Sequence, residues 1–113
     1  MINADPHWRV PPTDLRLRAN EVHVWRALSN VSTGEIESLQ SMLVDEELEQ
    51  ARRFYFEKDR RRWMMAHAIL RMLLGRYLDA DPRELRFRTN TYGKPSLAYP
   101  HTGAHLHFNL SHS

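Results

Sequence analysis

Basic side chains that could bind phosphate gather in one short stretch of the sequence. An acidic run comes just before it, so charge is unevenly distributed along a chain whose net charge is only +2. The fixed fork of N–H donors on an arginine guanidinium matches phosphate oxygens, and a phosphate-bearing partner responds to nearby charge more than to the total. The stretch therefore predicts contact with phosphate, while a solvated helix face remains the alternative for at least half of its arginines. The basic residues are Arg52, Arg53, Lys58, Arg60, Arg61 and Arg62, and the acidic run is Asp45, Glu46, Glu47 and Glu49.

A second candidate for ligand binding is the tetrapeptide Tyr92-Gly93-Lys94-Pro95. Glycine tolerates backbone conformations that are closed to other residues, and proline fixes its own φ. The sequence Gly93-Lys94-Pro95 therefore predicts a rigid turn whose main chain can approach a flat base. An ordinary hairpin turn with a solvated lysine is the alternative, because these residue types are frequent in turns.

The third candidate is the final segment, Phe108-Asn109-Leu110-Ser111-His112-Ser113. The Ser111 hydroxyl and the His112 imidazole can both donate hydrogen bonds to phosphate oxygens, the imidazole as a cation near neutral pH. A solvent-exposed tail is the alternative for these last residues. His105 and His107 share one strand face and could approach one metal, but without a third ligand at a defined spacing we predict surface histidines.

The composition limits the class of protein. The chain contains no cysteine, which excludes disulfides and cysteine-ligated zinc and fits the cytoplasm, our predicted location. Residues 1–12 carry Asp5, Arg9 and three prolines where a secretion signal needs an apolar run, and no window has the length and apolarity of a membrane span. We therefore predict no membrane partner and, with 113 residues, one modest core.

Taken in order, these segments resemble the amino-terminal half of the Sfp-type 4′-phosphopantetheinyl transferases, in the holo-acyl-carrier-protein synthase superfamily. The resemblance rests on Arg52-Arg53-Phe54-Tyr55-Phe56 before a long helix that begins with arginines, then the Tyr92 to Pro95 turn, then the Phe108 to Ser113 segment. It runs from about Val22 to the last residue. We therefore predict an irregular leader over 1–20 and an amino-terminal α/β subdomain over 21–113 that ends before the metal-binding half.

The resemblance implies an enzyme built from two similar halves that pack as a pseudo-dimer, with coenzyme A in the cleft between them. The activity it implies is transfer of 4′-phosphopantetheine from coenzyme A to a serine of an acyl- or peptidyl-carrier protein, which releases adenosine 3′,5′-bisphosphate. It also implies Mg²⁺ on the pyrophosphate, held by carboxylates that lie beyond the Ser-His-Ser segment in the family. We therefore expect no catalytic and no metal-binding residue in this chain, and no activity of the chain alone.

The resemblance also assigns residues to the coenzyme A site. It places Gly93, Lys94 and Pro95 against the adenine and Ser111 and His112 on the phosphates. Arg62 and Arg53 fall near the 3′-phosphate. One departure affects these contacts, because Glu47 and Gln50 stand where members of the family carry lysines; Arg52, Arg53 or Arg61 could substitute for them.

The elements that must position these residues follow from periodicity and capping signals. Apolar residues recur at helical spacing from Trp63 to Tyr77, while Arg60, His67 and Arg71 mark the wetter side of that helix. The expected fold class is α+β, a small antiparallel sheet packed on a long helix, as one half of the pseudo-dimer. The expected elements are a strand over 21–28, a helix over 33–43 behind the Ser32 to Glu35 capping box, a second helix that Asp45 caps, a long helix over 59–78, and strands over 85–89, 96–99 and 104–110.

Two other functions remain open at this point. Arginines alternate with aromatic residues from Arg52 to Trp63, so a small basic α/β module that binds RNA or a nucleotide is the alternative. It accounts for neither the Gly93 turn nor the Ser111-His112 end, so we expect no nucleic-acid partner. The other is a degenerate or purely structural fragment that pairs with itself. If the second half is absent, apolar surface meant for it is exposed, and the chain pairs through that surface with the missing half or with itself.

Overall fold

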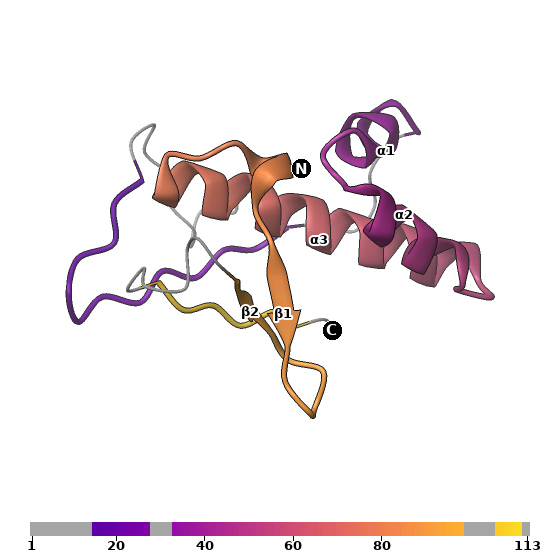
Figure 1. The fold of residues 1–113 in the computed structure, drawn as a ribbon. Coiled ribbons are helices and arrows are strands. Elements are labelled where there is room, and N and C mark those ends of the chain that lie inside the picture. Colours follow the sequence, from indigo (N-terminus) through magenta and orange to yellow (C-terminus); the bar gives the residue numbers. More distant parts are fainter. Residues whose placement is uncertain (1–14, 28–32, 99–105, 112–113) are drawn as a thin grey trace.

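The computed structural model describes residues 15–27, 33–98 and 106–111. Within them, three helices precede a short antiparallel hairpin, which confirms the predicted α+β class (Figure 1). The helices α1 and α2 lie beside the N-terminal half of α3, and the hairpin crosses the helix beyond them and extends away from it. The elements are α1 (Thr33–Gln40), α2 (Asp45–Arg52), α3 (Glu57–Leu78), the 3-10 turn η1 (Pro82–Glu84), β1 (Phe87–Thr89) and β2 (Pro95–Leu97).

The long helix α3 organises the core, as its apolar spacing predicted. It begins at Glu57, two residues before the predicted start, and carboxylates in its first turn suit the positive end of the helix dipole. It ends where Asp79 takes a left-handed conformation and the Ala80 N–H donates to the Gly75 carbonyl at 2.9 Å. The prediction that Arg71 lies on the wet side is wrong, because its side chain is only 3% exposed.

The shorter helices differ slightly from the predicted ones. Helix α1 ends at Gln40 instead of Leu43, and Ser32 of its expected capping box lies outside the described residues. Helix α2 has Val44, not Asp45, at its N-cap. The valine side chain cannot accept a hydrogen bond, so the Glu47 carboxylate accepts from the Val44 N–H at 3.2 Å and satisfies that amide.

Apolar residues form two clusters on α3. The first packs α1, α2 and Leu15 against one part of the helix, and it contains Leu15, Ile36, Leu39, Leu43, Ala51, Met64, Met65, Ala68, Ile69 and Leu73. The second packs the hairpin region on the helix through Leu70, Leu74, Leu85 and Leu97, with Phe87, Leu106 and Phe108 at its edge. The predicted packing of a small antiparallel sheet on a long helix is therefore confirmed.

The hairpin pairs Phe87 with Leu97 and Thr89 with Pro95. Its strands are shorter than the predicted ones, and β2 starts one residue earlier than predicted. Leu97 is buried while Ser96 beside it is exposed, so the alternation that predicted a strand matches the burial.

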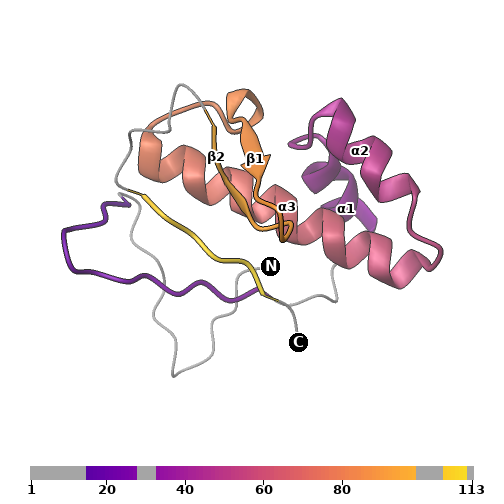
Figure 2. The same cartoon turned by 60° about the horizontal axis from the view of Figure 1, so that its bottom comes forward.

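Two predicted strands are not strands over the described residues. Within 21–28, residues 21–26 have no regular pairing and only Ala27 forms an isolated bridge. Residues 106–110 likewise have no strand assignment, although Leu106, Phe108 and Leu110 are half-buried and His107 and Asn109 are exposed, as the alternation predicted. Both segments run as stretched chain without helical turns (Figure 2).

Among the helices of the described residues, none is long and apolar enough to cross a membrane.

Candidate functional site

The turn that connects β1 to β2 is held by one side chain, Asn90. Its carboxamide oxygen accepts hydrogen bonds from the Tyr92 N–H and the Lys94 N–H, both at 2.9 Å. Its backbone accepts from the Gly93 N–H and donates to the Lys94 carbonyl, both at 3.0 Å. The turn is therefore a rigid loop with four hydrogen bonds, although the sequence prediction did not include Asn90.

Gly93 has a backbone conformation that explains its residue type. Its φ is +80°, in the region that side chains with a Cβ rarely adopt, and no other atom would lie within 4 Å of a Cβ placed there. Glycine is therefore required by backbone conformation and not by crowding. The sequence prediction of a rigid turn here rested on the same conformational freedom of glycine.

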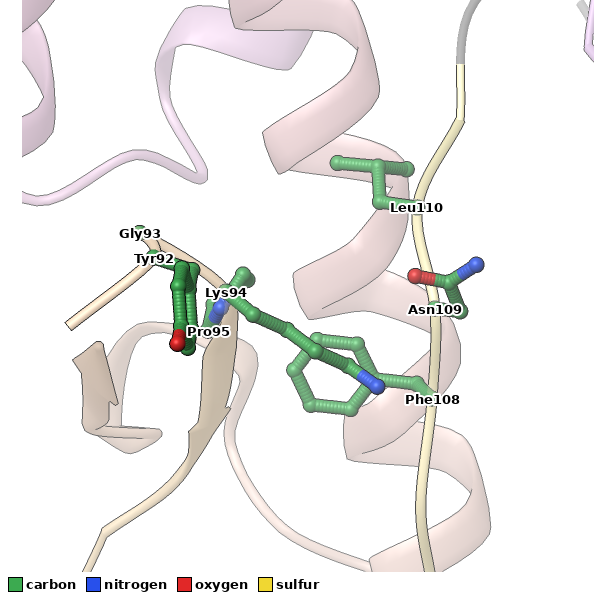
Figure 3. A pocket seen from close by; sticks show the side chains of 7 residues that line it. All are labelled: Tyr92, Gly93, Lys94, Pro95, Phe108, Asn109 and Leu110. Carbon is green, nitrogen blue, oxygen red and sulfur yellow. The ribbon is translucent and has the colours of Figure 1, made fainter. Parts of the chain in front are cut away.

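A pocket of about 270 Å³ lies between this turn and the end of the described chain. Figure 3 shows the Lys94 side chain extending across it toward the Phe108 ring. The walls come from two segments that residues 96–107 separate, and the lining residues are Tyr92, Gly93, Lys94, Pro95, Phe108, Asn109 and Leu110.

The lining chemistry suits a flat, partly polar ligand that carries negative charge. Tyr92 and Phe108 offer aromatic surface, and Asn109 offers a carboxamide with both donors and an acceptor. The Lys94 ammonium is exposed and supplies positive charge at the pocket. The pocket can therefore combine a stacking surface with hydrogen bonds and one cation.

The structure brings only some of the predicted site residues together. Gly93, Lys94 and Pro95 line the pocket, and Ser111 follows its last lining residue directly and is exposed. His112 lies outside the described residues. Arg53 is exposed at the C-cap of α2 and Arg62 is half-buried on α3, and neither lines the pocket.

A family model for the 4′-phosphopantetheinyl transferase N-terminal region matches residues 25–113, most of the chain. The chain belongs to the 4′-phosphopantetheinyl transferase family. The matched range includes the turn, the final segment and the basic stretch.

Individual members of the family are similar over much of this chain. It is 39% identical over 106 residues to the 4′-phosphopantetheinyl transferase HetI of Nostoc sp., covering 94% of this chain and 45% of that protein. It is 34% identical over 83 residues to the 4′-phosphopantetheinyl transferase Sfp of Bacillus subtilis, covering 74% of this chain and 36% of that protein. A phosphopantetheinyl transferase of Thraustochytrium sp. is 38% identical over 74 residues, 66% of this chain and 25% of that protein. The chain thus spans less than half the length of these curated relatives.

The structure gives one of the two departures from the family pattern a structural role. Glu47 accepts a hydrogen bond from the Val44 N–H and from Arg71 Nε at 2.6 Å, so its carboxylate is engaged inside the fold. Gln50 is exposed on the same helix. Sequence reasoning missed the pairing with Arg71 because the partners are 24 residues apart.

No group of three or more histidine, aspartate or glutamate side chains that could hold a metal ion occurs within 15–27, 33–98 and 106–111.

Proposed function

We propose that this chain supplies part of the coenzyme A site of a 4′-phosphopantetheinyl transferase that converts an apo carrier protein to its holo form. In the proposed reaction, the serine oxygen of the carrier protein attacks the phosphorus that bears the pantetheine arm. A new P–O bond forms, and the bond from that phosphorus to the bridging pyrophosphate oxygen breaks. The electron pair leaves with adenosine 3′,5′-bisphosphate, and the serine proton passes to a base outside the residues assigned here.

The observation that carries the proposal is the pocket in which the Gly93 turn faces the Phe108 to Leu110 segment. These are two of the three segments on which the family resemblance rests, and residues 96–107 separate them along the chain. A shared pocket is what a common ligand requires of them.

We assign the parts of coenzyme A to this surface as follows. The adenine lies against Gly93, Lys94 and Pro95, where a rigid main chain and aromatic neighbours suit a flat base. We assign the phosphates to Ser111, which follows the last lining residue in sequence, and to His112. Arg53 and Arg62, in the basic stretch, bind the 3′-phosphate region. Glu47 does not take part, because its carboxylate is bound to Arg71.

The remaining partners of the proposed enzyme follow from the family. The acceptor is an acyl- or peptidyl-carrier protein, and the second half of the site comes from the further length that the relatives possess or from a second copy of this chain. Mg²⁺ would neutralise charge that develops on the pyrophosphate. None of the residues assigned here is proposed as its ligand, and no step is assigned to the ion. We place the protein in the cytoplasm, in keeping with its lack of cysteine.

The proposal predicts that coenzyme A binds the chain and that Lys94→Ala weakens binding at least about tenfold, the loss typical of a hydrogen bond to a charged group. Isothermal titration calorimetry at moderate ionic strength measures this. The matched control is Arg83→Ala, which removes one positive charge from an exposed residue outside the pocket. Equal losses in both variants, or no binding by the unmodified chain, would overturn the assignment of the pocket.

The same titration with a short single-stranded oligonucleotide at two salt concentrations tests the alternative function. Nucleic-acid affinity falls steeply with salt because counterions are released from the phosphate backbone. Tight oligonucleotide binding that falls steeply with salt, combined with weak coenzyme A binding, would favour the RNA-binding module. We expect the reverse order of affinities.

A further inference from the structure

Arg71 is a buried arginine whose contacts reach four parts of the fold. From its place on α3, its Nε donates to Glu47 of α2 at 2.6 Å. One terminal nitrogen donates to two backbone carbonyls, those of Pro82 at 2.8 Å and Leu85 at 2.7 Å. The guanidinium carbon also lies 5.0 Å from the centre of the Phe87 ring.

These contacts continue to the wall of the pocket. Phe87 is the first residue of β1 and pairs with Leu97 of β2, so it fixes the base of the hairpin that carries the Gly93 turn. Its ring also packs edge-to-face on Phe108, with ring centres 5.9 Å apart and planes at 85°. Phe108 lines the pocket. A continuous series of contacts therefore runs from Glu47 through Arg71 and Phe87 to Phe108.

A charge buried to this degree is costly unless its hydrogen bonds are satisfied, and an apolar residue could fill the space at lower cost. The Arg71 guanidinium donates to the Glu47 carboxylate and to the backbone carbonyls of Pro82 and Leu85, so its charge is hydrogen-bonded inside the fold. Its guanidinium is planar and rigid, so these bonds fix the direction of the chain from η1 into β1. A buried arginine at this place is therefore explained by the backbone that it holds in position.

We propose that the Glu47–Arg71 pair is a positioning device for the pocket. It sets the hairpin and the Phe108 ring at the separation that the ligand requires, and it links the pocket to α2, whose C-cap is Arg53. The proposal rests on the proposed function for the identity of the ligand, coenzyme A. The positioning itself concerns the hairpin and is measured independently of any ligand.

The test uses the full chain and three variants of the pair. Arg71→Met keeps the bulk and removes every hydrogen bond, while Glu47→Gln keeps an acceptor oxygen and removes only the charge. Arg71→Lys keeps the charge but lacks the planar fork that serves the carboxylate and both carbonyls. We expect Arg71→Lys to restore part of what Arg71→Met loses.

Two readouts separate positioning from general stability. The first is hydrogen exchange by NMR at the amides that hold the hairpin, those of Gly93, Lys94 and Ala98, which donate to Asn90 and Arg86. The second is the dissociation constant for coenzyme A, measured well below the unfolding temperature. We expect Arg71→Met and Glu47→Gln to accelerate hairpin exchange more than exchange in α1, and to weaken coenzyme A binding at least about fivefold, the lower end of typical coupling between sites.

Two controls are available in the same chain. Glu49→Gln removes an exposed carboxylate of α2 whose partner, Arg52 at 2.7 Å, is also exposed, so we expect neither readout to change. Ile69→Val destabilises α3 in the other apolar cluster and serves as the variant of reduced stability. It should accelerate exchange in the chain as a whole and leave coenzyme A binding unchanged.

Each outcome decides the proposal. A selective rise of hairpin exchange in Arg71→Met and Glu47→Gln supports the positioning role. If the unmodified chain does not bind coenzyme A, that failure overturns only the proposed function. Hairpin exchange no faster than in Ile69→Val overturns the positioning role. So does coenzyme A affinity unchanged in Glu47→Gln and Arg71→Met while the unmodified chain binds.

Discussion

At the scale of single residues, the pocket depends on a side chain and a backbone angle that act together. Asn90 holds the amides of Tyr92 and Lys94 through one carboxamide oxygen, and Gly93 adopts the positive φ that closes the loop between them. Asparagine side chains commonly bond to backbone two residues on and stabilise turns in this way. The positions of Lys94 and Pro95 at the pocket therefore depend on the backbone conformation of Gly93.

We predict that Gly93→Ala lowers the free energy of unfolding by about 1–2 kcal/mol, because a Cβ makes the left-handed conformation strained. The distorted turn should also weaken coenzyme A binding. The control is Gly34→Ala in α1, which likewise meets no atom within 4 Å but has no positive φ. In that helix alanine should leave stability unchanged or raise it by up to about 1 kcal/mol. Chemical denaturation measures both, and equal effects would contradict the conformational argument.

Residue type correctly predicted the turn at Gly93 and wrongly predicted that Arg71 is exposed. The difference has a physical reason. A turn that needs positive φ is a local property, so Gly-Lys-Pro indicates it without knowledge of the rest of the fold. The burial of Arg71 depends on an acceptor in α2 and on carbonyls 11 and 14 residues further along the chain. Polarity alone placed it on the wet side, because arginine is almost never fully buried unless it is paired.

At the scale of elements, a strand was predicted over 21–28. The described segment 15–27 is instead attached to α3 through side chains. The Trp25 indole donates from Nε1 to the Tyr77 hydroxyl at 2.9 Å, and His23 Nδ1 lies 2.5 Å from the same oxygen. Both rings pack against the Tyr77 ring. One hydroxyl near the C-terminal end of α3 therefore anchors a segment that has no strand ladder over its described residues.

The difference from the predicted strand has a physical cause. Alternation of apolar and polar residues shows which side chains can share a face, but a strand also needs a neighbour that supplies main-chain partners. Val22 is 87% exposed and Val24 is 69% exposed, so the apolar face predicted for this segment is not covered. The hairpin was predicted more accurately because its two strands are adjacent in sequence and bring their own partner.

We predict that Tyr77→Phe lowers the free energy of unfolding by about 1–2 kcal/mol, through the lost hydrogen bonds of Trp25 and His23. The indole N–H signal of Trp25 should shift in the NMR spectrum because its acceptor is gone. Tyr92→Phe is the matched control, since the Tyr92 side chain is 94% exposed and its hydroxyl is not needed for packing. An unmoved Trp25 signal in Tyr77→Phe would show that the segment is anchored in another way.

At the scale of the whole molecule, large apolar side chains are left on the outside of the described structure. Tyr55 is 92% exposed, and it packs edge-to-face on Phe56, which is also exposed. Contiguous exposed apolar surface of this kind marks interaction sites in soluble proteins. In the proposed function, this surface is where further polypeptide would contact the chain.

This leads to the last prediction, that the chain alone does not convert an apo carrier protein to its holo form with coenzyme A and Mg²⁺ present. Transfer requires the carrier serine and the pyrophosphate to be held together, and in the proposed function this chain supplies only one side of that site. Mass spectrometry of the carrier protein measures the outcome, with the full-length Nostoc enzyme as the positive control. A phosphopantetheine adduct formed by the chain alone would show that its own residues, in one copy or two, complete the site. Repeating the assay across chain concentrations would then separate those two cases, because only a site shared between copies loses activity on dilution.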